Sequence, residues 1–311
     1  MPYVFPRCQC LPLPGQQVSF TIDGTERLRW NFSSAETRPF FYPVLGPSGH
    51  PLTRMGHPGA PDHDHHKSVW FAHNKVHGIN FWADTSPARI RQTEWLAYHD
   101  TDDAAVMGVK LHWLDGHDPA PLLEQRLIVA VRPGPQTGET LLEVQSQFRP
   151  TADLLELEKT NFGLLAVRVA KSLSVHFGGG QLTDSEGRVG EPAIFGNAAR
   201  WMDYSGPVPG GLTEGIAFIE HPSNPRHPTH WHVREDGWMG AAFCLQESWQ
   251  LRNDQPLTLR YLLYVHSGGA DPAKIEAAFQ NYAALPPFEI QRSQQKNEFW
   301  AIERMPAASS R

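Results

Sequence analysis

The stretch AAVMGVKLHWL at residues 104–114 places apolar side chains close to every second position, which is the spacing of a half-buried β-strand. QRLIVAVRP at 125–133, ETLLEVQSQFRP at 139–150 and LTLRYLLYVHSG at 257–268 follow the same pattern. Similar segments lie at residues 16–23, 162–175 and 214–221. Because these segments follow one another at short spacing without strand–helix alternation, we predict an all-β sandwich or barrel.

One segment near the end departs from this pattern. DPAKIEAAFQNYAAL at 271–285 begins with Asp271 as a plausible N-cap and Pro272 at the first helical position. Its apolar residues then recur at helical spacing and share one face. We therefore predict a single short amphipathic helix here, within one β domain of residues 1–291 that is followed by a polar tail of residues 292–311.

The bulk composition limits the classes of function. The chain has 311 residues and a net charge of −6, and no Lys/Arg run stands out, so we expect no nucleic-acid partner. No stretch approaches the roughly 20 apolar residues that span a bilayer, and no secretory signal is visible, so we expect a cytoplasmic protein without a membrane partner. Three cysteines make neither a disulfide framework nor a CxxC zinc site.

Histidines gather in two windows of the sequence. HPGAPDHDHHKSVWFAHNKVHGINFW at 57–82 holds six of the sixteen, and EHPSNPRHPTHWHVR at 220–234 holds four more. Imidazoles packed beside carboxylates perturb one another's pKa values, and such networks are enriched at functional sites. The three prolines of HPSNPRHPTHWHVR at 221–234 indicate a stiff loop that ends in an extended segment, where His230 and His232 share one side and Trp231 takes the other.

A metal site remains an alternative interpretation of the windows. The first window contains neither the HExxH string nor a complete cupin or metallo-β-lactamase spacing. Imidazole suits Zn²⁺, Mn²⁺ and Fe²⁺ alike. The sequence implies no definite cofactor, and in the alternative His63, His65 or His66 binds a divalent metal together with His230 or His232.

Two charged positions between the windows invite a functional interpretation. Glu158 could form a surface ion pair beside Lys159, or it could face a cleft opposite an imidazole and take part in acid–base chemistry. Arg168 lies within the apolar run LLAVRVA, so it is either paired internally or directed into a pocket, and we favour the pocket.

Five motifs together resemble a bacterial family of uncharacterised proteins that is often labelled "methane oxygenase PmoA-like". They are RPFFYPVLGPSGHPLTR (38–54), DHDHHKSVWFAHNKVHGINFW (62–82), EKTNFGLLAVRVA (158–170), WMDYSG (201–206) and HPSNPRHPTHWHVR (221–234). The resemblance spans roughly Arg38 to Val265. The label itself is misleading, because a membrane methane oxygenase subunit needs apolar helices that this sequence lacks.

What the resemblance implies is a fold similar to the galactose-mutarotase-like β-supersandwich, a large antiparallel β-sandwich. Proteins of that broad group handle carbohydrates on a concave sheet face and typically use a histidine acid and a glutamate base. The implied function is a carbohydrate-active epimerase, lyase or glycoside hydrolase that acts on a small carbohydrate or glycoside. A metal-dependent enzyme and a non-catalytic carbohydrate-binding protein are the alternatives, and the sequence does not define the oligomeric state.

The candidate site residues follow from these roles. The catalytic candidates are His66, His77 and Glu158. The substrate-binding candidates share a polar or aromatic side chain in or beside the motifs, and they are Arg54, His57, Trp82, Asn161, Arg168, Asn224, Arg226, His227, His230, Trp231 and Arg234.

Overall fold

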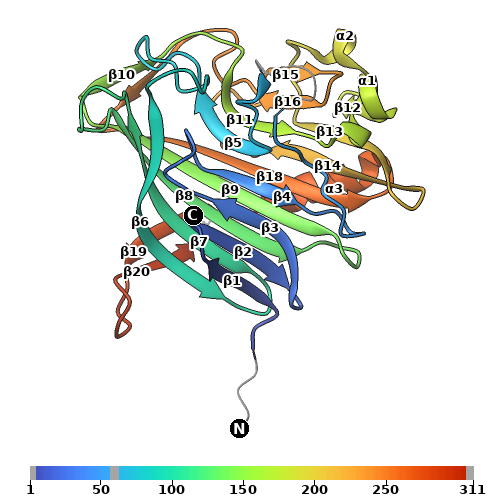
Figure 1. Cartoon of the computed structure of the whole chain (residues 1–311), viewed down its shortest axis with the longest axis horizontal. Coiled ribbons are helices and arrows are strands. Elements are labelled where there is room, and N and C mark those ends of the chain that lie inside the picture. The colour runs from blue at the N-terminus through green and yellow to red at the C-terminus, as the bar shows by residue number, and fades with distance from the viewer. Residues whose placement is uncertain (1–4, 57–62, 306–311) are drawn as a thin grey trace, which may run out of the picture.

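Two eight-stranded antiparallel sheets form the body of the molecule in a computed structural model, which describes residues 5–56 and 63–305 (Figure 1). The first sheet has the order β1-β2-β3-β4-β5-β11-β16-β15. Its strands are β1 (Cys8–Leu13), β2 (Gln17–Ile22), β3 (Thr25–Asn31), β4 (Phe40–Val44), β5 (Val69–His73), β11 (Gly163–Arg168), β15 (Trp231–Arg234) and β16 (Trp238–Ala241).

The second sheet has the order β12-β13-β14-β18-β9-β8-β7-β6 and contains the longest strands. Its strands are β6 (Arg89–Asp100), β7 (Ala105–Leu114), β8 (Leu123–Pro133), β9 (Thr140–Pro150), β12 (Gln181–Asp184), β13 (Trp201–Val208), β14 (Leu212–Glu220) and β18 (Leu257–Ser267). Two small two-stranded sheets complete the strands: β10 (Leu154–Leu157) with β17 (Trp249–Arg252), and β19 (Phe288–Arg292) with β20 (Trp300–Arg304).

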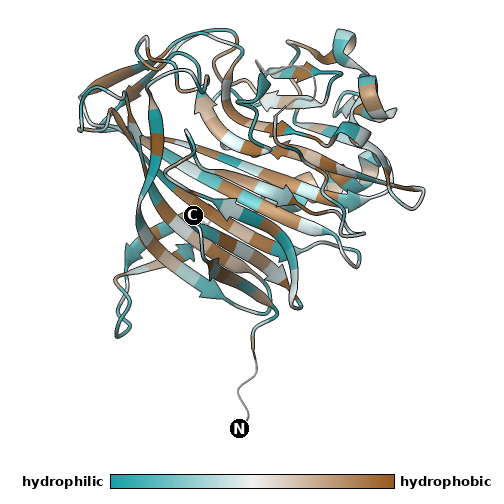
Figure 2. Ribbon diagram, viewed as in Figure 1, coloured by the Kyte–Doolittle hydropathy of each residue, from teal (hydrophilic) through white to brown (hydrophobic). Residues whose placement is uncertain are grey.

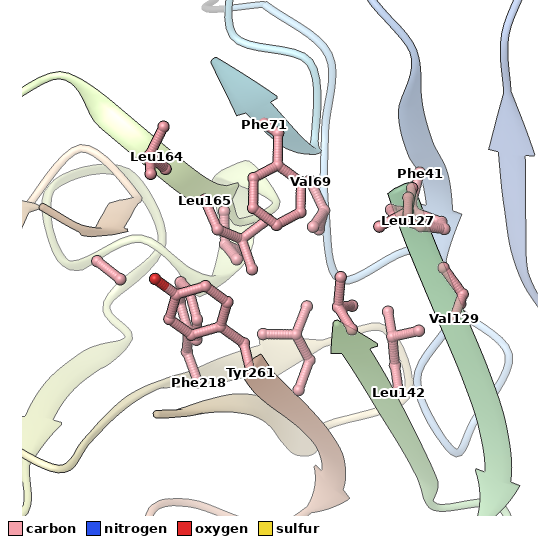
Figure 3. Packing of buried hydrophobic residues seen from close by; sticks show 14 of the residues in the cluster. Phe41, Val69, Phe71, Leu127, Val129, Leu142, Leu164, Leu165, Phe218 and Tyr261 are labelled. Atoms are coloured by element: carbon pink, nitrogen blue, oxygen red, sulfur yellow. The ribbon is translucent and has the colours of Figure 1, made fainter. Parts of the chain in front are cut away.

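The main core lies between the two large sheets, because apolar side chains on alternate positions of each strand point toward the other sheet. Figure 2 shows the resulting mixture of brown and teal segments along the long strands. Phe41, Val69 and Phe71 of the first sheet pack in one cluster with Leu127 and Phe218 of the second (Figure 3). The predicted all-β sandwich is therefore confirmed, and every pairing in both sheets is antiparallel.

The predicted C-terminal helix is also confirmed. Helix α3 (Pro272–Ala283) begins after Asp271, whose side chain accepts hydrogen bonds from the backbone N–H groups of Ala273 and Lys274. Ile275, Phe279 and Tyr282 are buried against β13, β14 and β18, on the face of the second sheet that points away from the main core. None of the helices in the described part of the chain has the length and apolar character needed to cross a membrane.

Three details differ from the expected elements. The apolar run at 162–175 is a strand only as far as Arg168, and the chain then turns through a 3₁₀ helix η2 (Lys171–Leu173) and a short helix α1 (Val175–Gly178). A second short helix, α2 (Glu191–Ile194), precedes β13. Within the polar tail, β20 returns to pair with β19, and Ile302 packs on Ile128 and Ala130 of β8.

Candidate functional site

The two histidine windows meet in one pocket on the face of the first sheet that points away from the core. This pocket, named the histidine pocket below, has a volume of about 350 Å³. The first window supplies His63, His65, His66, Asn74, Asn80 and Trp82, and Ala83 directly follows it. The remaining lining residues come from β11, β15, β16 and their flanks, and they are Phe162, Arg168, His232, Arg234, Asp236 and Trp238.

Strand alternation explains why these side chains face the pocket. In β15, Trp231 packs in the main core, so His232 on the next position points to the opposite face. In β5, Val69 belongs to the core while Trp70 belongs to a separate aromatic cluster on the outer face. The predicted division of His232 from Trp231 is therefore what the strand shows. The same alternation also places Trp231 in the core instead of on a binding surface, and its indole N–H donates to the carbonyl of Ala199.

Aromatic rings form the floor of the histidine pocket. Trp70, Trp82 and Trp238 pack on one another with ring centroids 5.2–5.5 Å apart, and Trp82 and Trp238 are only 3 % and 2 % exposed. The His66 ring lies 4.9 Å from Trp238 and 5.6 Å from Trp70. Phe162 extends the row, with its ring 5.5 Å from Trp82. Such contacts fix the rings because tilted and edge-to-face packing is favourable at these distances.

Arg38, a buried arginine that is not among the predicted site residues, connects the loop that contains His65 to the segment that contains Trp82. The guanidinium of Arg38 donates to the carbonyl oxygens of His65 and Trp82, at 2.9 and 2.6 Å, and pairs with Asp84. Burial lowers the pKa of Arg38 to about 10, which still leaves the group charged at neutral pH. Arg38 therefore holds the histidine loop and the Trp82 segment at a fixed separation.

His232 is held as a neutral acceptor. Its Nδ1 lies 2.9 Å from the carbonyl oxygen of Asn161, and because a carbonyl only accepts, Nδ1 must carry the proton. Nε2 then presents a lone pair. Burial lowers the pKa of His232 to about 4, so the imidazole is uncharged at neutral pH. The structure thus gives one member of the second window a defined tautomer.

Arg168 is both paired and part of the pocket lining, so the two alternatives left by the sequence are compatible. Its two terminal nitrogens contact the two carboxylate oxygens of Asp236 at 2.8 and 3.0 Å. Asp236 lies in the turn between β15 and β16, and Arg54 donates to its backbone carbonyl at 3.0 Å. Arg54 does not line the pocket, and its contacts support the turn instead.

The other two catalytic candidates lie outside the histidine pocket. The Glu158 carboxylate accepts a hydrogen bond from the backbone N–H of Gly78 at 2.6 Å, which places it beside His77. Glu158 lines a neighbouring, more open pocket of about 900 Å³, named the adjoining pocket below, together with Asn161. His77 is exposed and lines neither pocket.

Three candidates of the second window have structural contacts away from the pocket. Asn224 exchanges hydrogen bonds with the backbone of Arg260, and Arg226 donates to three backbone carbonyls between Phe243 and Ser248. His227 contacts the buried Glu220 through Nδ1. These contacts hold the proline-rich loop in place and occupy its polar side chains, so these side chains do not line the histidine pocket.

The remaining substrate-binding candidates are Arg234, His230 and His57. Arg234 lines the histidine pocket, pairs with Glu191 at 2.7 Å and stacks on Phe195. His230 does not line it, although burial lowers the pKa of its ring. His57 lies outside the described residues.

The metal alternative finds no assembled ligand set in the described structure. His63, His65 and His66 have ring centroids 4.5–6.1 Å apart. Across residues 5–56 and 63–305, however, no three His, Cys, Asp or Glu side chains are arranged so that they could hold a metal ion. His230 lies apart from the pocket, whereas His232 lines it.

Several pocket residues were not predicted, and they are Asn74, Asn80, Phe162, Asp236 and Trp238. Asn74, Asn80 and Phe162 lie within the motifs, but nothing in their spacing distinguishes them. Asp236 had a local signal, because the Asp-Gly pair at residues 236–237, just past the second window, is typical of a tight turn between strands. Such a turn brings the residues on either side of it to the same sheet face.

The fold and the pocket define a β-sandwich protein with an aromatic-floored, imidazole-rich site on the outer face of one sheet. A family model matches residues 17–280, so the chain belongs to a family of unknown function, DUF6807. The "methane oxygenase PmoA-like" label is not confirmed by this match. No curated protein matched the sequence.

Among solved structures, the chain is similar to proteins described as sugar enzymes. A putative aldose 1-epimerase from Escherichia coli K12 has 12% identity and a TM-score of 0.37, with 84% of this chain and 99% of that chain covered. A putative mutarotase from Salmonella typhimurium has 11% identity and a TM-score of 0.28, with 85% and 97% covered. A polysaccharide lyase has 8% identity and a TM-score of 0.32, with 94% of this chain and 36% of that chain covered. All three TM-scores are below 0.5, so these similarities carry no argument about the function.

Proposed function

We propose that this protein is an enzyme that binds a carbohydrate in the histidine pocket and acts on it by acid–base chemistry. The observation that carries the proposal is the meeting of His66 and His232, which lie about 165 residues apart in the sequence, over a floor of Trp82 and Trp238. A volume of about 350 Å³ suits a small ligand, since ligand pockets range from about 300 to 1,000 Å³.

The chemistry of the lining favours a sugar over other small ligands. Carbohydrates combine weakly polar C–H faces with many hydroxyl groups, and the pocket is lined by two tryptophans beside amide, imidazole and carboxylate groups. The charges of Arg168 and Arg234 are balanced by Asp236 and Glu191. The pocket therefore favours a ligand that presents hydrogen-bonding groups without a strong charge.

His232 and His66 are the proposed acid–base pair. His232 Nε2 takes a proton from the sugar, because its pKa of about 4 keeps it unprotonated at neutral pH and its Nδ1 is already anchored on Asn161. His66 returns a proton to a ring or leaving oxygen. The two transfers conserve protons and electrons, so epimerase, lyase and hydrolase reactions share this step without an oxidant.

Glu158 has a different place in this proposal from the one its sequence position suggested. Since its carboxylate is held on Gly78 and faces the adjoining pocket, we assign it to ligand contact there and not to proton transfer. His77 has no proposed role in the reaction.

The test is turnover of a panel of monosaccharides and glycosides by the wild-type protein and two variants. His232→Asn keeps a donor for the Asn161 carbonyl and removes Nε2, and we expect it to lower kcat at least 100-fold while sugar affinity changes less than tenfold. We expect a similar loss for His66→Asn. His230→Asn is the matched control, because this histidine lies outside the pocket, and it should retain wild-type kcat.

Three outcomes would contradict the proposal. Sugar binding without turnover by the wild-type protein would favour a binding protein, and wild-type kcat in His232→Asn would remove the assigned base. Activity that a chelator abolishes and Zn²⁺, Mn²⁺ or Fe²⁺ restores would favour the metal-dependent alternative.

A further inference from the structure

The histidine pocket and the adjoining pocket lie side by side. Asn74 and Phe162 line both of them, so the two spaces meet at these side chains. The adjoining pocket is wider, at about 900 Å³ against about 350 Å³. A ligand longer than one ring could therefore contact both pockets on either side of Phe162.

A continuous row of rings runs from one pocket into the other. The His232 ring lies 5.1 Å from Phe162 and 5.3 Å from Phe195, and Phe195 lines the adjoining pocket. Phe195 is 37 % exposed, so part of its ring is accessible to a ligand. Arg234 of the histidine pocket stacks on this ring, with its guanidinium carbon 4.6 Å from the ring centroid, and so holds it at the junction.

The charges around the adjoining pocket balance. Two lysines, Lys75 and Lys159, line it together with two glutamates, Glu156 and Glu158. Equal numbers of opposite charges give no net attraction for an anionic or a cationic ligand, while they provide several hydrogen-bond donors and acceptors. The exposed Phe195 face adds a stacking surface. This combination suits a second, uncharged sugar ring.

From these observations we infer that the adjoining pocket is a second sugar-binding subsite, so that the ligand is a neutral glycoside of at least two units. This inference rests on the proposed carbohydrate function. One unit occupies the histidine pocket, and the next stacks on Phe195 between the lysine and glutamate side chains.

The test compares matched ligands by isothermal titration calorimetry. A panel of neutral monosaccharides is titrated beside the disaccharides that extend each of them, with wild-type protein and with Phe195→Ala. We expect at least one disaccharide to bind tenfold more tightly than its monosaccharide. Phe195→Ala should remove that tenfold advantage and change the monosaccharide Kd less than twofold.

Two further variants make the result specific. Phe177 on α1 is similarly exposed, at 39 %, and lines neither pocket, so Phe177→Ala should keep the full advantage of the disaccharide. Leu245→Trp places bulk in the adjoining pocket and should also remove the advantage, even if Phe195→Ala fails to fold.

The outcomes separate this inference from the proposed function. Equal affinity for each monosaccharide and its disaccharide, or a disaccharide advantage that survives both Phe195→Ala and Leu245→Trp, would overturn the second subsite and leave the carbohydrate function standing. Tighter binding of a uronate-containing disaccharide than of its neutral counterpart would overturn the assignment of an uncharged unit. Failure of every sugar to bind would instead overturn the proposed function.

Discussion

At the scale of single residues, the pair formed by Arg168 and Asp236 shows how burial decides the cost of a charge. The Arg168 side chain is 1% exposed, whereas the Asp236 side chain keeps 27% of its surface in contact with solvent. Water can therefore stabilise an isolated Asp236 carboxylate but not an isolated Arg168 guanidinium. The two partners should respond differently to substitution.

We predict that Asp236→Asn lowers the free energy of unfolding by about 3 kcal/mol, because it leaves the buried guanidinium without its counter-charge. Arg168→Met should cost less, about 1 kcal/mol, since an apolar side chain can replace a buried ion pair at little cost. Urea unfolding at pH 7 measures both values. Asp254→Asn, at an exposed pair with Arg252, is the control and should stay within about 0.5 kcal/mol of wild type. An equal loss in the Asp236 and Arg168 variants would contradict this explanation.

Residue-level predictions from the sequence succeeded where strand alternation alone decides the direction of a side chain. The placement of His232 opposite Trp231 is an example. The predictions from sequence were less successful for Asn224, Arg226 and His227. A polar residue in a loop looks the same in sequence whether it contacts backbone groups or a ligand. Only the positions of distant carbonyls, such as that of Arg260 beside Asn224, separate the two cases.

At the scale of elements, helix α3 depends on a cap that the sequence already indicated. The Asp271 carboxylate accepts hydrogen bonds from two backbone N–H groups of the first turn, at 3.1 and 3.2 Å. Without this cap, those donors lose their protein partner. The helix packs on the second sheet, whereas the histidine pocket lies on the first, so the cap should affect stability and not activity.

We predict that Asp271→Ala lowers the free energy of unfolding by about 1 kcal/mol and leaves sugar turnover unchanged. Asp271→Asn preserves a capping oxygen and should cost only a few tenths of a kcal/mol. Chemical unfolding of the three proteins provides the comparison. If alanine and asparagine destabilise the protein equally, the lost charge matters more than the cap.

Element prediction failed at one instructive place. The segment after β11 remains apolar through Val169, Leu173 and Val175, so its composition continues to resemble a strand. In the structure, Arg168 ends the strand, and the Ala170 N–H bonds to the carbonyl of Leu52 outside the strand pairings of the sheet. That partner lies 118 residues away in the sequence, so no local pattern could indicate it.

At the scale of the whole molecule, buried histidines couple folding to pH. Burial lowers the pKa of His73, His221 and His232 to about 4 in the folded protein. In an unfolded chain they would titrate near 6.5. Between these values the unfolded state binds more protons, so stability must fall as the pH falls from about 6.5 toward 4.

His266 acts in the opposite direction. Burial opposes its charged form, but the hydrogen bond to the buried Asp203 carboxylate outweighs that effect and raises the pKa of His266. Its contribution is therefore fully present below its unfolded pKa and is lost as the pH rises through its folded pKa. It therefore does not offset the loss of stability that His73, His221 and His232 cause as the pH falls.

We predict that the free energy of unfolding drops by about 3 kcal/mol between pH 6.5 and 5.5. Each of the three histidines contributes about 1 kcal/mol over this range, less than the limit of about 1.4 kcal/mol per pH unit, because the unfolded form is already half protonated at pH 6.5. Urea unfolding at half-unit pH steps measures the slope. His232→Asn should reduce it by about a third. A stability that is flat or rises over this range would contradict neutral buried histidines.

The sequence alone does not show whether the two histidine windows share one pocket. Sequence patterns predicted the sandwich because each strand carries its own alternation, whereas the pocket depends on β5, β11, β16 and β15 becoming neighbours in one sheet. That order is set by packing between residues far apart in the chain.

The measurement that tests the central claim most directly is a crystal structure of the protein with the sugar that binds most tightly in the panel. We predict that a sugar ring lies over Trp82 and Trp238, with hydroxyl groups within hydrogen-bond distance of His66 and His232. A sugar bound only elsewhere, for example in the polar pocket beside Arg126 and Gln147 on the second sheet, would contradict the account.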